Sequence, residues 1–240
     1  MGIDVIPAFI RERYEVHEWK HACAILAQDF PAEWRDICEL LTQFRLRKRW
    51  LTEGGGNKSP ISASIDSFLY SRGWLEKQFD TEIVIDGQAS KSPTHNVDCF
   101  KNRVALEIEW NNKDPFFDRD LNNFRLLFEL RAVSVGVIIT RCDELQQVFK
   151  DIGRAGSFGA STTHMSKLLP RINGGSGGGC PLLGFGRTQK RLEESAECTK
   201  SALARTSLHE PRTIGSRPSW LTRLGSSRIA PAKLRLSIGD

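Results

Sequence analysis

The sequence predicts an α/β domain with a mixed β-sheet flanked by helices, a helical N-terminal part and a C-terminal tail of low order. Two strand patterns predict the sheet. Residues 104–110 place apolar and other side chains alternately, as a half-buried strand does. Residues 133–140 are almost wholly apolar and rich in β-branched side chains, which is typical of a strand covered on both faces. A helical pattern at 118–130 lies between them, so we expect a right-handed β-α-β crossover.

Length and composition limit the class of protein. The 240 residues suffice for one full domain with appendages. No run of about 18 apolar residues is present, and the N-terminus lacks a basic segment followed by an apolar core, so we expect neither a membrane span nor a secretory signal. The six cysteines occur singly, without C-x-x-C pairs, which indicates reduced thiols in a cytoplasmic protein.

The net charge of +5 is unevenly distributed. Residues 189–240 hold 10 of the 34 basic and 5 of the 29 acidic residues, which leaves residues 1–188 with 24 of each. The body is therefore neutral overall. Any nucleic-acid surface on it must be a local basic patch set against acidic surface elsewhere.

Helical patterns dominate the N-terminal part, 1–52. Apolar residues recur at helical spacing in 34–44, and the basic run at 45–50 follows; we favour a solvated helix face for this run over a DNA contact. The glycine-rich segment 54–59 lacks the spacing of a phosphate-binding loop and is predicted to be a flexible loop. A helix is expected from residue 61, ending at Gly73.

The remaining elements follow in order along the chain. We expect a strand at 82–86, a loop at 87–95 and a β-hairpin at 97–110. In the helix at 118–130, Asp118 is a possible N-cap, and Leu121, Phe124, Leu127, Phe128 and Leu130 form its apolar face. A further helix is expected at 143–153, then a glycine-rich loop at 174–186 that ends in a short strand at PLLGF. Beyond Gln189 the only aromatic residue is Trp220, so the tail is predicted to lack a packed core.

Three carboxylates on the predicted hairpin are the candidate functional residues. Glu107 and Glu109 share a face because strand side chains alternate, and Asp98 joins them if residues 98 and 105 are paired. Asp98 and Glu107 would then be diagonal neighbours, roughly 7–8 Å apart. Clustered carboxylates repel one another unless a cation offsets their charge, and oxygen ligands favour a hard ion such as Mg²⁺. The alternative is a solvated acidic strand face with Lys and Arg partners, and spacing alone does not decide between them.

An aspartate, a short turn, E-x-E on the next strand, then a helix and a buried strand resemble the PD-(D/E)xK nuclease core. Three stretches make the resemblance more specific: THNVDCFKNRVALEIEWNNKDPFFDRDLNNFRLLFE, STTHMSKLLPR and GGGCPLLGFG. They are similar to type II restriction endonucleases of the BglII and BstYI group, relatives of BamHI, over roughly residues 50–187. The resemblance implies a restriction-endonuclease-like catalytic domain over 1–188, followed by a basic tail at 189–240.

Carried onto this sequence, the resemblance assigns Asp98 and Glu107 as the metal-binding pair and places Glu109 where the motif usually has lysine. Related enzymes have glutamate or glutamine there, so the departure leaves open whether one or two metals act. The chemistry implied is Mg²⁺-dependent phosphodiester hydrolysis with Asp98, Glu107 and Glu109 as catalytic residues. Glu76 is a weaker candidate for a helix-borne carboxylate, and we favour a surface position for it.

Two polar segments are candidates for reading DNA bases. One is the turn directly after the catalytic strand, and the other is the STTHMSK segment. Their candidate residues are Asn111, Asn112, Lys113, Ser161, Thr162, Thr163, His164 and Lys167. Asparagine suits adenine, lysine suits guanine, and serine or threonine suits several base edges. The alternative is turn capping by the asparagines and helix N-capping by the Ser-Thr-Thr run; the resemblance favours DNA contact.

Members of the resembling group cut palindromes centred on GATC as homodimers. The sequence therefore predicts a homodimeric, site-specific double-stranded DNA endonuclease of the type II restriction class, cytoplasmic and without a membrane partner. Two alternatives stay open. One is a structure-specific repair nuclease with the same core. The other is a catalytically silent DNA-binding module, against which the three intact carboxylates argue.

Overall fold

The computed structural model describes residues 2–52, 59–156, 161–174 and 179–190. The chain divides into two compact units, 1–197 and 198–240, and every described residue lies in the first. The predictions for residues 54–58 of the glycine-rich loop, the centre of the loop at 174–186 and nearly all of the tail therefore fall outside the described residues.

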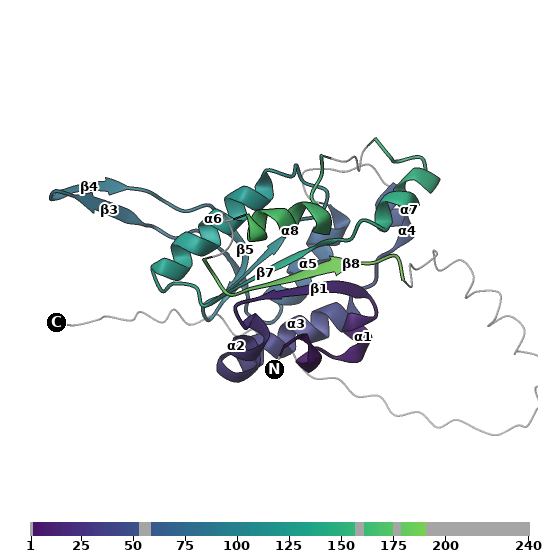
Figure 1. Ribbon diagram of the computed structural model, residues 1–240, viewed down its shortest axis with the longest axis horizontal. Coiled ribbons are helices and arrows are strands. Elements are labelled where there is room, and N and C mark those ends of the chain that lie inside the picture. Colours follow the sequence, from purple (N-terminus) through teal and green to yellow (C-terminus); the bar gives the residue numbers. More distant parts are fainter. Residues whose placement is uncertain (1, 53–58, 157–160, 175–178, 191–240) are drawn as a thin grey trace, which may run out of the picture. The chain divides into compact units, whose positions relative to one another are not determined.

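A six-stranded mixed sheet forms the centre of the first unit, in the order β1-β8-β7-β6-β5-β2 (Figure 1). Its strands are β1 (Tyr14–Trp19), β2 (Leu75–Lys77), β5 (Val97–Lys101), β6 (Val104–Ile108), β7 (Val135–Arg141) and β8 (Leu182–Arg187). β6, β7 and β8 are parallel, and the strands on either side of them pair antiparallel. The predicted mixed sheet and the parallel pairing of β6 with β7 are thus confirmed.

Helices cover both faces of this sheet (Figure 1). One face packs against η1 (Ile3–Val5), α1 (Ala8–Arg11), α2 (Ala22–Asp29), α3 (Pro31–Gln43), α4 (Lys48–Thr52), α5 (Pro60–Tyr70) and α7 (Leu145–Asp151). The other face packs against α6 (Phe116–Glu129) and α8 (Met165–Asn173). Val104, Leu106 and Ile108 point to the first layer, whereas Ala105 packs against the second. β6 is therefore buried on both faces, not half-buried as its alternation predicted, because α6 covers the second face.

The hairpin of β5 and β6 sets the relative positions of the candidate carboxylates. Cys99 pairs with Leu106 and Phe100 with Ala105, and the turn consists of only Asn102 and Arg103, both with positive φ. The predicted pairing of residues 98 and 105 is wrong by two residues, because the turn is tighter than expected. An even shift keeps every side chain on its predicted face. Asp98 therefore stays on the face of Glu107, and lies opposite it rather than diagonal to it.

Helix α6 begins earlier than its sequence pattern suggested. Its first residue is Phe116 and Pro115 occupies the N-cap, so Asp118 lies in the first turn and does not cap the helix. Proline suits a helix start, where its missing N–H leaves no hydrogen bond unmade. Leu130 lies beyond the last helical residue and is 54% exposed, so it does not belong to the apolar face.

Three strands were not predicted, namely β1, β4 and β2, the last in a segment that was considered for a helix. β1 interrupts the otherwise helical N-terminal part and pairs with β8 along its whole length. β4 (Gln88–Lys91) lies in the segment expected to be a loop and pairs with β3 (Glu82–Ile85). Asp86 and Gly87, both with positive φ, make the two-residue turn that the Asp-Gly dipeptide favours. This hairpin forms a separate two-stranded sheet that extends away from the main one (Figure 1).

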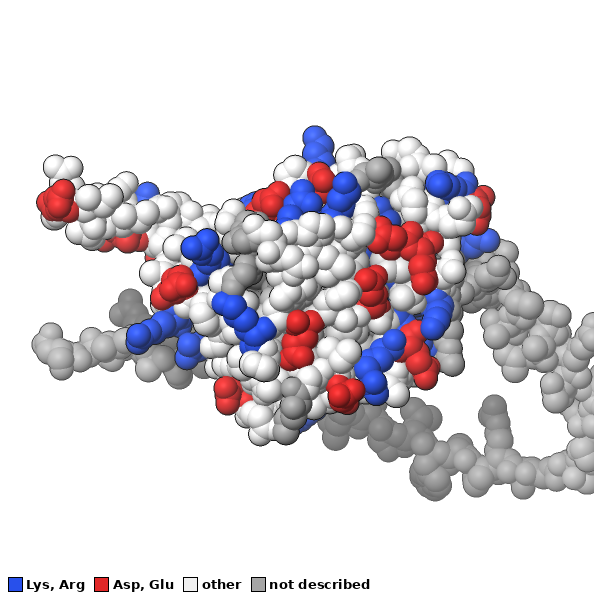
Figure 2. All heavy atoms as spheres, viewed as in Figure 1, with Lys and Arg blue, Asp and Glu red and all other residues white. Residues whose placement is uncertain are grey.

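Surface charge and thiols agree with the composition. On the face shown in Figure 2, acidic and basic side chains are interspersed, as a neutral body implies. The described cysteines, Cys23, Cys38, Cys99, Cys142 and Cys180, are free thiols. Within the described ranges, no helix is both long and apolar enough to cross a membrane.

Candidate active site

Four carboxylates approach one another where β6 ends and α6 begins. Asp98 comes from β5, Glu107 from β6, Glu109 from the residue after Ile108, and Asp120 from α6. The backbone N–H of Glu109 still donates to Ile139 O at 2.9 Å, which holds it in line with β6. Glu107 and Glu109 are each 1% exposed and Asp120 is fully buried. So much buried negative charge is costly unless it is offset.

Asp98 and Glu107 are linked through the strand backbone. Asp98 Oδ2 accepts from the Ile108 N–H at 2.9 Å, and the Asp98 N–H donates to Glu107 Oε2 at 3.2 Å. Glu107 Oε1 is buried and has no hydrogen-bond partner among the described residues. Burial, followed by the charges of Asp120 and Asp98, raises the pKa of Glu107 well above its usual value, and burial also raises the pKa of Asp98. A buried carboxylate oxygen without a partner fits a cation at this pair.

Glu109 is held by one residue of α6 and one residue of the turn between β6 and α6. Its Oε2 accepts from Asn112 Nδ2 at 2.9 Å, and its Oε1 lies 3.4 Å from Arg119 Nη2. Arg119 Nε also donates to Asp120 Oδ1 at 2.8 Å. Burial and then the charge of Asp120 raise the pKa of Glu109 to about 9. Arg119 thus supplies a positive charge beside Glu109.

The structure brings the three predicted carboxylates into one region, but does not arrange them as a set of metal ligands. Among the described residues, no group of three or more His, Cys, Asp or Glu side chains is placed to hold a metal ion. Asp98 and Glu107 are adjacent, whereas Glu109 is bonded to Asn112 and Arg119. The oxygen donors and the unpartnered oxygen of Glu107 suit a hard divalent cation.

Sequence inspection missed Asp120 and Arg119, although both lie on the helix next to the motif. Their signal is their place in the first turns of α6, the segment that must pack against β6 in a β-α-β unit. Glu76 lies in strand β2, not on a helix; it is exposed, as expected, and accepts from Asn96 Nδ2 at 2.9 Å.

The two segments predicted to read DNA lie side by side. Lys113 and Thr162 form a β-bridge, and the Thr163 N–H donates to Asn112 O at 2.8 Å. The Asp114 N–H donates to Ser161 O at 2.9 Å. We call the two segments, 111–114 and 161–164, the paired loops. Their backbone contacts place both beside the end of β6.

Several polar side chains of the paired loops are already bonded within the protein. Thr163 is fully buried, and its Oγ1 donates to Glu109 O at 3.2 Å and accepts from the Asn112 N–H at 3.1 Å. His164, which is 8% exposed, lies 2.5 Å from Asp143 through Nδ1 and is itself the N-cap of α8. Lys113 and Ser161 are exposed and Lys167 is half-buried. The alternative of helix N-capping by the Ser-Thr-Thr run is therefore wrong by one residue, because His164 is the N-cap.

Arg141, the last residue of β7, joins the two paired loops. Its Nε donates to Asn111 Oδ1 at 2.9 Å and its Nη2 donates to Thr162 Oγ1 at 2.8 Å. The side chain is buried, and its guanidinium lies 5.1 Å from the ring centre of Phe149. Burial lowers the pKa of Arg141 to about 10. The sequence signal, an arginine at the end of an apolar strand, was present but was not used.

A six-stranded mixed sheet between helical layers, with adjacent acidic residues on a hairpin and the next helix packed beside them, is the architecture of the restriction-endonuclease-like fold. The family model for restriction endonuclease BglII/BglIII matches residues 14–187, from β1 to the end of β8. The chain therefore belongs to the BglII/BglIII restriction endonuclease family. The match begins at residue 14, whereas the resemblance seen in the sequence covers only roughly residues 50–187. No curated protein matches the chain in a sequence search.

Proposed function

We propose that this type II restriction endonuclease hydrolyses phosphodiester bonds of double-stranded DNA at a short palindrome centred on GATC, with Mg²⁺ and as a homodimer. The unpartnered, buried Oε1 of Glu107 beside Asp98 is the observation that carries the metal-dependent part of the proposal. Family membership supports the nuclease class and DNA as its substrate.

Asp98 and Glu107 are the residues that would hold the cation. When bound, a divalent cation supplies positive charge for the phosphodiester and for the leaving oxygen, and it acidifies a water molecule. Arg119 is 34% exposed at its side chain and adjoins Glu109, so it holds a donor near the place where a phosphate would enter. Glu109 is fixed by Asn112, which connects the acidic cluster directly to the turn that reads DNA.

The paired loops are the proposed recognition element. Lys113 and Ser161 present exposed polar groups, with Lys167 beside them. Asn111 and Thr162 are held by Arg141, and Thr163 by Glu109 O, so their role in recognition is to fix the loops that carry the exposed groups. Cutting both strands of a palindrome needs two sites related by a two-fold axis, which supports a homodimer.

Digestion of a sequenced plasmid in Mg²⁺, with the fragment ends mapped, tests the proposal. We expect discrete fragments that end at one palindrome, and no cutting in excess chelator. Glu107→Gln should abolish cleavage, whereas Glu76→Gln, an exposed carboxylate on β2, should leave it unchanged.

Three results would contradict parts of the proposal. Cleavage in excess chelator would contradict the requirement for a divalent metal. Cutting at flaps or mismatches would favour a structure-specific repair nuclease. Equal cleavage rates for Glu107→Gln and the parent would contradict the role of Asp98 and Glu107 in cleavage.

A further inference from the structure

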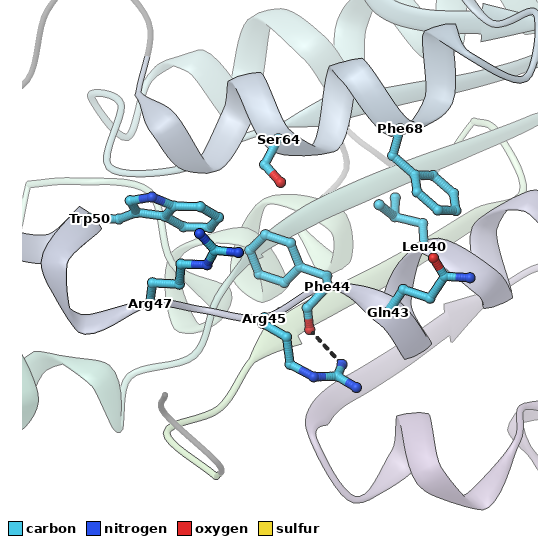
Figure 3. A pocket seen from close by; sticks show the side chains of 8 residues that line it. All are labelled: Leu40, Gln43, Phe44, Arg45, Arg47, Trp50, Ser64 and Phe68. Carbon is cyan, nitrogen blue, oxygen red and sulfur yellow. Dashed lines mark hydrogen bonds between the residues drawn. The ribbon is translucent and has the colours of Figure 1, made fainter. Parts of the chain in front are cut away.

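A small pocket lies between the end of α3, helix α4 and one side of α5 (Figure 3). Its volume is about 190 Å³. It is lined by Leu40, Gln43, Phe44, Arg45, Arg47, Trp50, Ser64 and Phe68. The lining contains two arginines and three aromatic rings but no carboxylate, so the pocket combines positive charge with flat apolar walls.

Arg47 is fixed by stacking and not by an ion pair. Its guanidinium lies 5.1 Å from the ring centre of Trp50, and the Phe44 and Trp50 rings are 6.3 Å apart. Figure 3 shows the guanidinium beside both rings. The guanidinium of Arg47 has no hydrogen bond or ion pair within the part of the chain that the structure describes. Arg72, in the same helical layer, differs from Arg47: it stacks on Phe68 but also forms an ion pair with Glu39 at 2.9 Å.

The backbone around the pocket places further positive charge at its edge. Arg45 Nη1 donates to Thr42 O at 2.6 Å and to Phe44 O at 3.1 Å, which holds its guanidinium at the C-terminal end of α3. The basic run at 45–50 was expected to form a solvated helix face. Only its second half is helical, since α4 begins at Lys48, and Arg45 and Arg47 precede the helix and line the pocket.

The pocket lies at the same edge of the sheet as the acidic cluster. Arg154, which follows β7 and α7 in the chain, donates to Thr52 O at the end of α4. The strands β6, β7 and β8 are parallel, so their carboxyl ends lie at one edge of the sheet. Helices α4 and α7 lie toward this same edge (Figure 1).

Helix α5 separates the pocket from Asp98. Phe68 lines the pocket, whereas Tyr70, two residues later and thus about 200° around the helix, donates from its hydroxyl to Asp98 O at 3.0 Å. A helix with its side chains is about 10–12 Å wide, roughly the length of three base-pair steps along B-DNA. A duplex bound at the acidic cluster could therefore reach the pocket with a phosphate a few nucleotides away.

We propose that this pocket binds a backbone phosphate of the DNA, a few nucleotides from the bond that is cut. The inference rests on the proposed function, since it needs a duplex at Asp98 and Glu107. The guanidinium of Arg47 supplies the charge-assisted hydrogen bonds, Ser64 and Gln43 supply neutral donors, and stacking on Trp50 keeps the guanidinium in place before DNA arrives.

Two variants with matched controls test this proposal in the full-length protein. Arg47→Gln removes one of the two positive charges that line the pocket, and Arg49→Gln removes an exposed charge two residues later, on α4, that does not line the pocket. Ser64→Glu places a negative charge in the pocket, and Ser67→Glu places one on the exposed surface of the same helix α5. Binding to a labelled 30-base-pair duplex in Ca²⁺ is measured by fluorescence anisotropy over a series of NaCl concentrations.

We expect Arg47→Gln to weaken binding about tenfold and to lower the salt slope by about one, with a smaller effect from Arg49→Gln. Ser64→Glu should weaken binding more than Ser67→Glu. Equal effects within each pair would mean that charge acts only at long range, and would overturn the pocket assignment. A parent that binds and cuts DNA while both pocket variants bind like their controls refutes this inference alone. A parent that binds no duplex refutes the proposed function, and the inference with it.

Discussion

Replacing Arg141 by methionine tests how the paired loops are held. The side chain keeps a similar length and stays apolar along its stem, but it loses the hydrogen bonds to Asn111 Oδ1 and Thr162 Oγ1. It also removes a buried charge that lies against Phe149. The lost hydrogen bonds therefore lower stability, whereas removal of the buried charge raises it.

The two effects have similar size. Hydrogen bonds from a charged donor contribute about 1.5–3 kcal/mol each, so losing two costs about 3–6 kcal/mol. Burial that lowers the pKa of Arg141 from 12.5 to about 10 corresponds to a penalty of about 3 kcal/mol, which the neutral methionine does not carry. The net loss in the free energy of unfolding should be about 0–3 kcal/mol, or up to about 10 °C in Tm.

The effect on specificity should exceed the effect on stability. Without the guanidinium the paired loops keep their backbone bridge but lose their attachment to β7. We expect Arg141→Met to cut non-cognate palindromes much more readily relative to the cognate site, measured by cleavage of a randomised six-base-pair library. Urea unfolding measures stability, and Arg125→Met, an exposed arginine on α6, is the control. An unchanged cleavage profile, or a stability loss above about 5 kcal/mol, would refute this account of Arg141.

Glu107→Gln should stabilise the metal-free protein, and the gain should be larger at pH 8 than at pH 5. The reason is that a carboxyl whose pKa is raised by folding destabilises the fold increasingly as pH rises above its unfolded pKa. Urea unfolding in chelator at both pH values measures the gain, and an equal gain at both would contradict this prediction. Lys113→Ala should cost about 1–3 kcal/mol at one position of the palindrome if it contacts a base, or reduce the salt slope by about one if it contacts a phosphate; an unchanged library profile and salt slope would remove Lys113 from the interface. A chain that ends at Lys190 should keep its cooperative thermal transition and lose non-specific DNA affinity, since residues 191–240 carry most of the net positive charge; loss of the transition would show that the tail is needed for folding. Gly136→Ala should lower stability by about 1–3 kcal/mol in calorimetry, because its Cβ would lie 2.5 Å from Phe124 Cδ2; a parental Tm would mean that the ring can move aside.

The elements with strong periodicity could be predicted from the sequence. β6, α6 and β7 follow from alternation, a helical stripe and a β-branched run. The common face of the acidic residues on β5 and β6 survived an error in register, because a shift of two residues conserves the side of the strand. Local pattern was sufficient wherever the deciding contacts were close in sequence.

What escaped prediction depends on contacts between distant residues. β1 is a strand because β8, about 170 residues away, pairs with it. Asp120 joins the acidic cluster only because α6 packs on β6, and Arg141 is important only because it meets Thr162. Thr163 and His164 are predicted DNA contacts on the basis of the resemblance and of their residue types, whereas their burial follows from packing that the sequence pattern does not contain.

The pairing of β1 with β8 has a consequence for how the chain folds. β8 lies inside the sheet, between β1 and β7, yet it is the last strand in sequence among the described residues. Contacts of such long sequence separation carry a large loop-closure cost and form slowly. Until residues 182–187 arrive, β7 has an open edge and β1 has no partner, so a nascent or truncated chain exposes apolar strand edges that favour aggregation. The sheet therefore cannot close before residues 182–187 have been synthesised, and truncation before Arg187 should yield aggregates and not smaller active domains.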